Sequence, residues 1–155
     1  MRTVNRIHMR APLERVFAAA SAVDRWPAIL PHYRWVRPLG GGLVEMAAWR
    51  PFGGGILNYP TWWVSEMTVD RAAGEIRYRH IRGITRGMDV VWRLTQRDGG
   101  TEAEIVHTWS GPRWPLVGAL AADLVIGPVF IHAIAARTLA GIKRAVEETK
   151  VGASW

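Results

Sequence analysis

Residues 114–148 read WPLVGALAADLVIGPVFIHAIAARTLAGIKRAVEE, and this run decides how the rest of the chain must fold. Its first half is apolar around almost the whole circumference, and its second half is amphipathic with a helical period. Pro115 suits the first position of a helix, and the pair Gly127-Pro128 predicts a bend within it. Because a helix this apolar must be buried, it needs a sheet to cover it. We therefore expect one long, bent C-terminal helix packed across a sheet.

The residues before this run alternate between short apolar segments and turn-forming glycines, prolines and aspartates. A strand is predicted at residues 2–9, and two short helices follow it at 12–22 and 24–30. Six further strands are predicted at 32–39, 43–50, 56–69, 75–82, 85–96 and 101–110. No parallel crossover follows the two helices, so the strands should form one antiparallel sheet. The predicted fold class is α+β, with a curved antiparallel sheet wrapped around the long helix.

The composition indicates a single globular domain. The chain has 155 residues, of which 49% are hydrophobic, and this is enough for a buried core. We assign residues 1–150 to the domain and 151–155 to a short tail. Residues 1–10 lack the apolar core of a signal peptide, and residues 116–126 are too few to span a bilayer, which takes about 20 residues. We therefore expect a cytoplasmic protein with no transmembrane segment, and a transient membrane contact is compatible with the sequence.

The composition also disfavours several kinds of site. The absence of cysteine excludes disulfides, thiol catalysis and cysteine-ligated metals. The histidines show neither HxH nor HExxH spacing, so neither a metal nor another cofactor is expected. The net charge is +7, but 18 of the 20 basic residues are arginines scattered along the chain. No helix-turn-helix, ribonucleoprotein or zinc-finger pattern accompanies them, so nucleic acid is not an expected partner.

Alternation along the strands predicts which side chains face the helix. Between residues 56 and 110, the predicted inward set combines aromatic rings, polar groups and methionines: Trp63, Ser65, Met67, His80, Met88, Trp92, His107 and Trp109. Tyr33, Trp35, Phe130 and Ile134 join this set as candidate ligand contacts from other segments. Such a mixture is typical of an apolar ligand cavity with a few polar groups rather than of a dry core.

Four stretches carry a resemblance to a known superfamily. They read AVDRWPAILPHY at 22–33, WVSEMTVD at 63–70, MDVVW at 88–92 and LAGIKRAVEE at 139–148. With the order of elements, they resemble the helix-grip fold of the START and Bet v 1-like (SRPBCC) superfamily, and in particular the tetracenomycin-type polyketide aromatase/cyclases. The resemblance implies a deep cavity between the sheet and the long helix. It also implies a pocket tyrosine at Tyr33, cavity positions at Trp63 and Ser65, and a cavity methionine at Met88.

One position departs from the pattern of those aromatase/cyclases. The resemblance implies a pocket arginine two residues after the serine, which would hold the substrate and assist aldol chemistry, but this chain has Met67 there. An aldol cyclisation needs an oxyanion partner and a proton donor close to the enol. Tyr33 is the candidate general acid, and the alternative is a buried tyrosine bonded to a backbone carbonyl. His80 and His107 are likewise candidates either for a base or for satisfied core residues.

These observations lead to competing functional hypotheses. The first is binding of a hydrophobic, ring-containing or lipid-like small molecule in an internal cavity, with polyketide cyclase or aromatase activity as its enzymatic form. The alternative is a non-enzymatic lipid or quinone carrier or chaperone of the same fold. A protein-interaction module would need an exposed apolar patch, for which residues 116–126 are the candidate. We expect binding to outweigh catalysis, because Met67 replaces the pocket charge and no acidic inward neighbour orients the histidines. A monomer and a homodimer are both compatible with the sequence.

Overall fold

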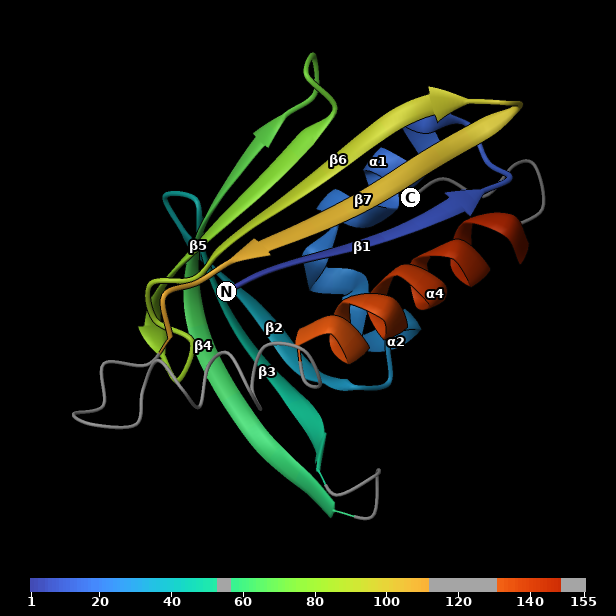
Figure 1. Cartoon of the computed structure of the whole chain (residues 1–155). Helices are drawn as coiled ribbons and strands as arrows, with labels where there is room; N and C mark the ends of the chain where they lie inside the picture. Colours follow the sequence, from blue (N-terminus) through green and yellow to red (C-terminus); the bar gives the residue numbers. More distant parts are fainter. Residues whose placement is uncertain (53–56, 112–130, 149–155) are drawn as a thin grey trace.

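The chain forms a curved antiparallel sheet with its helices gathered on one side (Figure 1). The computed structural model describes residues 1–52, 57–111 and 131–148. The strands are β1 (Arg2–Met9), β2 (Tyr33–Gly40), β3 (Leu43–Phe52), β4 (Leu57–Asp70), β5 (Glu75–Gly83), β6 (Asp89–Arg97) and β7 (Gly100–Thr108). The helices are α1 (Leu13–Ser21), the 3₁₀ turn η1 (Val23–Arg25), α2 (Trp26–Ile29) and α4 (His132–Glu148). The helix-grip fold predicted from the sequence is confirmed.

The sheet has seven strands in the order β1-β7-β6-β5-β4-β3-β2, and neighbouring strands are antiparallel. The first strand of the chain, β1, pairs with the last, β7, so the N-terminus lies next to the C-terminal end of β7. α4 packs against β1 and α1, and α2 packs against β2. We call the side of the sheet that faces these helices the concave face, and the opposite side the outer face.

Helices α1 and α4 each bury one stripe of side chains. The stripe of α4 has the three-to-four residue spacing predicted for its amphipathic half, and its buried residues are Ile134, Ala135, Thr138, Leu139, Gly141, Ile142 and Val146. Gly141 allows a close approach, since a Cβ there would lie 2.2 Å from Cδ2 of Leu30, just after α2. The predicted bend at Gly127-Pro128 lies outside the described residues. None of the described helices is long and apolar enough to cross a membrane.

The strand predicted at 85–96 begins later than expected, at Asp89. The reason is a turn between two glycines, because Gly83 and Gly87 have φ values of 93° and 88°, a region that other residues rarely adopt. Within this turn the backbone N–H of Gly87 donates to the carbonyl of His80 at 2.8 Å. The backbone N–H of His80 donates in turn to the carbonyl of Met88 at 2.9 Å. The turn therefore holds Met88 beside His80 at the end of the sheet.

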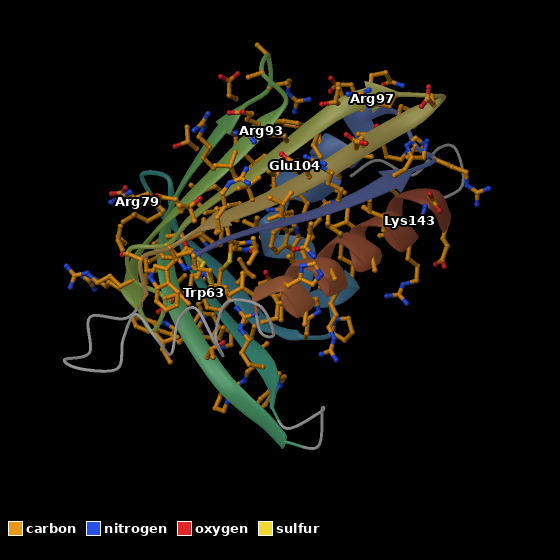
Figure 2. The ribbon with its side chains drawn as sticks, viewed as in Figure 1. Trp63, Arg79, Arg93, Arg97, Glu104 and Lys143 are labelled. Atoms are coloured by element: carbon orange, nitrogen blue, oxygen red, sulfur yellow. The ribbon has the colours of Figure 1, made fainter. Side chains whose placement is uncertain are left out.

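The outer face carries a row of alternating charges across four strands. Glu75 pairs in register with Arg93, Arg93 with Glu104, and Glu104 with Arg6. The side chains form ion pairs of 3.1 Å, 3.1 Å and 2.5 Å along this row. Figure 2 labels Arg93 and Glu104 on this side of the sheet. Each exposed pair contributes little stability, about 0–1 kcal/mol, but the row balances the arginines of the outer face with carboxylates.

Candidate functional site

The burial of side chains along β4 agrees with the predicted alternation between the concave face and the outer face. Trp63 is 3% exposed and Ser65 is fully buried, whereas Trp62 on the other face is 40% exposed. Among the other predicted contacts, Tyr33, His80, Met88, Trp92, Trp109 and Ile134 are buried, and Met67 and His107 are partly buried. Strand alternation thus brings most of the predicted site residues to the helix side of the sheet.

Trp35 is the predicted contact that the structure places elsewhere. The register of β2 against β3 shifts between Tyr33 and Trp35, which pair with Ala48 and Ala47 respectively. This bulge turns Trp35 to the outer face, where the Arg37 guanidinium lies 4.5 Å from its ring centroid. A bulge of this kind leaves no simple trace in a pattern of alternation. Phe130, another predicted contact, lies outside the described residues.

A group of rings in edge-to-face and tilted contact forms the apolar part of the site, and we call it the aromatic cluster: Trp26, Tyr33, Trp63, Tyr78 and Trp92. Trp26 lies at its centre, with ring centroids 5.1 Å from Tyr33, 6.4 Å from Tyr78 and 5.7 Å from Trp92. Tyr33 also meets Trp63, at 6.2 Å with nearly perpendicular rings. The indole N–H of Trp26 donates to the carbonyl of Ala19 at 3.2 Å, which fixes the ring beneath α1. Trp26 belongs to the stretch AVDRWPAILPHY but was not among the predicted site residues.

Polar groups interrupt this apolar surface along one cross-strand row. Met67, Tyr78, Val90, His107 and Thr3 are successive partners on β4, β5, β6, β7 and β1, so they share the concave face. Among the residues that the structure describes, the Tyr78 hydroxyl, the Nδ1 atom of His107 and the Thr3 hydroxyl on this row are buried without a hydrogen-bond partner. The Ser65 hydroxyl, two residues before Met67 on the same face of β4, has no partner in the described part of the chain either. Buried polar atoms are bonded in the large majority of cases, so this concentration is unusual.

Arg50 adds a positive charge that sequence analysis did not anticipate. It follows Val44, Met46 and Ala48 in the alternation of β3, and its guanidinium lies over the Trp63 ring, 5.0 Å from the centroid. Its Nη1 atom is buried and has no hydrogen-bond partner within the described ranges 1–52, 57–111 and 131–148. Burial lowers the Arg50 pKa to about 10, and the nearby Tyr33 hydroxyl opposes this shift. The expectation that Met67 leaves the pocket without a charge is therefore wrong, because the neighbouring strand supplies one.

The inward histidines are uncharged. Burial is the main cause that lowers the pKa of both His80 and His107 to about 3. The neighbouring His107 and then the Arg50 charge contribute to the shift of His80, and the Arg50 charge contributes to that of His107. His80 stacks on Trp63 at 5.7 Å, and its Nδ1 atom lies 2.6 Å from the Thr85 hydroxyl in the turn before β6. Thr85, rather than a carboxylate, therefore orients this ring. At neutral pH these imidazoles are hydrogen-bonding groups and weak bases.

Tyr33 joins the aromatic cluster to α4. Burial raises the Tyr33 pKa, whereas the Arg50 charge and a hydrogen bond with the Thr138 side chain lower it. The Thr138 hydroxyl also lies 3.0 Å from Nε2 of His32, whose ring centroid is 4.9 Å from that of Tyr33. The alternative of a backbone carbonyl partner for this tyrosine is thus replaced by a side-chain partner on α4. Tyr33 remains a protonated phenol at neutral pH and can donate a hydrogen bond.

A groove lies outside this site, between α4 and the segment that precedes β2. It has a volume of about 410 Å³, and its lining includes His32, Trp49, Arg137 and Arg144. Burial first, then the charges of Arg50 and Arg137, lower the His32 pKa to about 4. The groove is open to solvent and its arginines are exposed, unlike the interior around Trp63. Among the residues that the structure describes, no three His, Asp or Glu side chains are placed to hold a metal ion.

Comparison with known proteins supports the fold and gives the family. A putative polyketide cyclase from Streptomyces cyaneus is 29% identical over 101 residues, which are 64% of this chain and 66% of that protein. The Zhui aromatase/cyclase from a Streptomyces species has a similar structure, with a TM-score of 0.74, 17% identity and 99% of each chain covered. A START superfamily protein from Mycobacterium smegmatis gives a TM-score of 0.72 at 10% identity, covering 94% of this chain and 97% of that one. These structural likenesses concern the fold.

The sequence itself assigns the family. Residues 9–128 match the family described as polyketide cyclase / dehydrase and lipid transport. This match spans the segment from the end of β1 to beyond β7, and so includes the aromatic cluster and every residue of the polar row except Thr3 on β1. The chain therefore belongs to the polyketide cyclase / dehydrase and lipid transport family.

Proposed function

We propose that this protein binds a planar, hydrophobic, ring-containing small molecule against the aromatic cluster, with the polar end of the ligand directed at the cross-strand row. The observation that carries this proposal is the set of buried, unpartnered polar atoms on Ser65, Tyr78 and His107. A buried polar atom without a partner costs about 1–3 kcal/mol. A carbonyl or hydroxyl on a bound ligand would give these atoms their missing partners.

The apolar part of the proposed site suits aromatic or polyketide-like ligands. The rings of Trp26, Tyr33 and Trp63 meet edge to face or at a tilt, and offer both faces and edges to a planar molecule. Aromatic contacts of this kind contribute about 0.5–1.5 kcal/mol each beyond the area that they bury. The family description includes both cyclisation and lipid transport, so binding is the activity that its members would share.

Ring closure is the second candidate function, and the position of Tyr33 relative to Arg50 favours it. In an aldol cyclisation an enol carbon bonds to a ketone carbon, and the ketone oxygen gains negative charge before it takes a proton. The Tyr33 phenol is protonated at neutral pH and could supply that proton. The Arg50 charge, which is close enough to lower the Tyr33 pKa, could stabilise the developing alkoxide. The carrier hypothesis requires neither group to act on the ligand.

The binding proposal is tested by a matched pair of buried hydroxyl deletions. Ser65 has no partner, whereas the buried Thr101 hydroxyl donates to the Ala11 carbonyl at 2.9 Å. We expect Ser65→Ala to leave the free energy of unfolding unchanged or slightly raised and to weaken binding of 2-acetonaphthone, measured by titration calorimetry. Thr101→Val should lower the free energy of unfolding by about 1 kcal/mol and leave that affinity unchanged. The proposal fails if the ketone does not bind, or if both variants behave alike.

Ring closure is tested with a synthetic poly-β-ketone. If the protein is a cyclase, it accelerates cyclisation and Tyr33→Phe abolishes the acceleration while affinity for 2-acetonaphthone persists. If it is a carrier, both proteins bind the ketone and neither accelerates the reaction.

A further inference from the structure

Several arginines on the outer face of the sheet pair with carboxylates, and Arg50 on the concave face differs from them. Ion pairs there involve Arg6, Arg37, Arg77, Arg79 and Arg93. Among the described residues, no carboxylate forms an ion pair with Arg50 on the concave face. Arg50 is half-buried with its Nη1 atom enclosed, and a guanidinium desolvated in this way without an anion is costly unless a partner binds it or its charge has a function.

The groups around Arg50 do not neutralise it. Its charge influences Tyr33, His32, His80 and His107, which places all four nearby. At neutral pH the tyrosine is protonated and the histidines are uncharged, so Arg50 is the single formal charge within this described group. Trp63 provides partial compensation, because a cation over an indole ring is attracted by its negative face. The indole cannot accept the in-plane hydrogen bonds of the guanidinium N–H groups, one of which is the buried Nη1.

We infer that Arg50 is the anion-recognition residue of the buried site, and that the preferred ligand carries an ionised oxygen conjugated to its planar ring system, as in an aryl carboxylate or the enolate of a β-dicarbonyl. This inference rests on the proposed function and adds the charge of the ligand to it. An ionised oxygen would accept from the Arg50 guanidinium, and a ring attached to it would extend from Trp63 over the other rings of the aromatic cluster. The hydroxyls of Ser65 and Tyr33 would then donate to the same polar end.

This assignment also gives the neutral histidines a role. A binding site that contained protonated His80 and His107 would hold an anion without discrimination, through charge alone. Because both are neutral, a single guanidinium with directional N–H donors defines where the anionic oxygen lies. His107 and the Tyr78 hydroxyl, which flank Val90 on the cross-strand row, remain available for a second, uncharged oxygen of the ligand.

The test compares an acid with its neutral ester on the same ring. Titration calorimetry at pH 7.5 measures the affinities of 2-naphthoate and methyl 2-naphthoate for the native protein, Arg50→Met, Arg50→Lys and the control Arg144→Met. Arg144 lines the open groove between α4 and the segment that precedes β2, so replacing it removes the same charge from the protein at a different place. We expect the native protein and Arg144→Met to prefer the acid by about ten- to hundredfold, the range of a charge-assisted hydrogen bond. Arg50→Met should bind both ligands with similar affinity, and Arg50→Lys should recover part of the preference.

The possible results separate the inference from the function on which it rests. If the native protein binds acid and ester equally, the assignment of Arg50 is overturned and the binding function stands. If the preference survives in Arg50→Met and is lost in Arg144→Met, the anion binds in the groove and the assignment is overturned. If neither compound binds, the proposed function fails and the inference fails with it. Thermal unfolding of Arg50→Met checks the fold, and its midpoint should not fall because the substitution removes a buried charge.

Discussion

Lowering the pH from 7 to 5 should destabilise the protein, because the native fold keeps neutral three histidines that protonate freely once the chain unfolds. The pKa is lowered most in His80 and His107, and His32 contributes in the same direction. Burial holds the pKa of His80 and of His107 at about 3, against 6.5 for an ordinary histidine. Since the folded pKa lies below the unfolded one, the unfolded chain binds more protons in the interval between them. Stability is therefore full above about pH 6.5 and decreases as the pH falls from 6.5 towards 3.

The magnitude follows from the width of this interval. Each pH unit below the unfolded pKa costs about 1.4 kcal/mol for each histidine, so pH 5 costs about 2 kcal/mol for a fully buried one. His80 is 8% exposed and should approach this value, whereas His107 is only partly buried and should contribute less. We expect a loss of about 3 kcal/mol between pH 7 and pH 5, which is a large fraction of the 5–15 kcal/mol typical of a domain. Glu104 and Glu147 act in another interval, because ion pairs lower their pKa below 4.5 and their contribution is lost only below that pH.

Urea unfolding followed by tryptophan fluorescence at pH 7, 6 and 5 measures this loss. The double variant His80→Gln, His107→Gln should lose much less stability over the same range, even if it is less stable at pH 7. His8→Gln, at an exposed position on β1, provides the control for the substitution itself, since this side chain lies outside the buried site. If the double variant loses as much stability as the native protein between pH 7 and pH 5, the buried histidines do not cause acid lability and the description of the site is wrong.

Two further predictions concern strand β4 and its neighbours. Trp63→Phe should weaken binding of 2-acetonaphthone by about tenfold or more, whereas Trp62→Phe on the outer face should leave it within about twofold; calorimetry showing equal effects would contradict the assigned register. Gly83→Ala should lower the free energy of unfolding by at least about 2 kcal/mol in urea titrations, because the φ of 93° is strained for alanine and the added Cβ would lie 2.2 Å from the Trp62 carbonyl oxygen. A stable Gly83→Ala protein would show that the turn before β6 is not fixed by this glycine.

The sequence predicted those features of the site that depend on regular geometry. The period of two along β4 and β5 separated Trp63 from Trp62, and it placed His80 on the concave face, because the sheet obliges alternate side chains to opposite sides. Trp35 was predicted on the concave face but lies on the outer face, because the bulge after Tyr33 shifts the alternation by one residue. No residue type in β2 indicates this bulge. The delayed start of β6 had a visible signal, because Gly83 and Gly87 bracket the turn.

Arg50 was overlooked for a different reason. The alternation of β3 is sufficient to predict that Arg50 lies beside Met46 and Ala48 on the concave face. The pocket arginine was instead expected at the position of Met67, because the resemblance implied one there. A guanidinium sits at the end of a long side chain, so a neighbouring strand can deliver the charge to the same space. Similarly, Thr85 and Thr138 could not be recognised as partners of His80 and Tyr33, because the contacts join segments whose packing is decided by the tertiary fold.

The two faces of the sheet explain how such a costly site is tolerated. On the outer face, the row of Glu75, Arg93, Glu104 and Arg6 satisfies each charge with its neighbour, and on the concave face the parallel row leaves Tyr78 and His107 unpartnered. The backbone ladder fixes the spacing of both rows, so the inner side chains cannot collapse onto one another to form the missing bonds. The fold thus holds unsatisfied groups a fixed distance apart, at a cost in stability that the apolar packing of α4 and the aromatic cluster offsets. A ligand that pairs with these groups forms hydrogen bonds away from water, where they are strong, and the groups are already held in position before it binds. For this reason we assign the recognition of a polar, charged oxygen to this face rather than to the open groove.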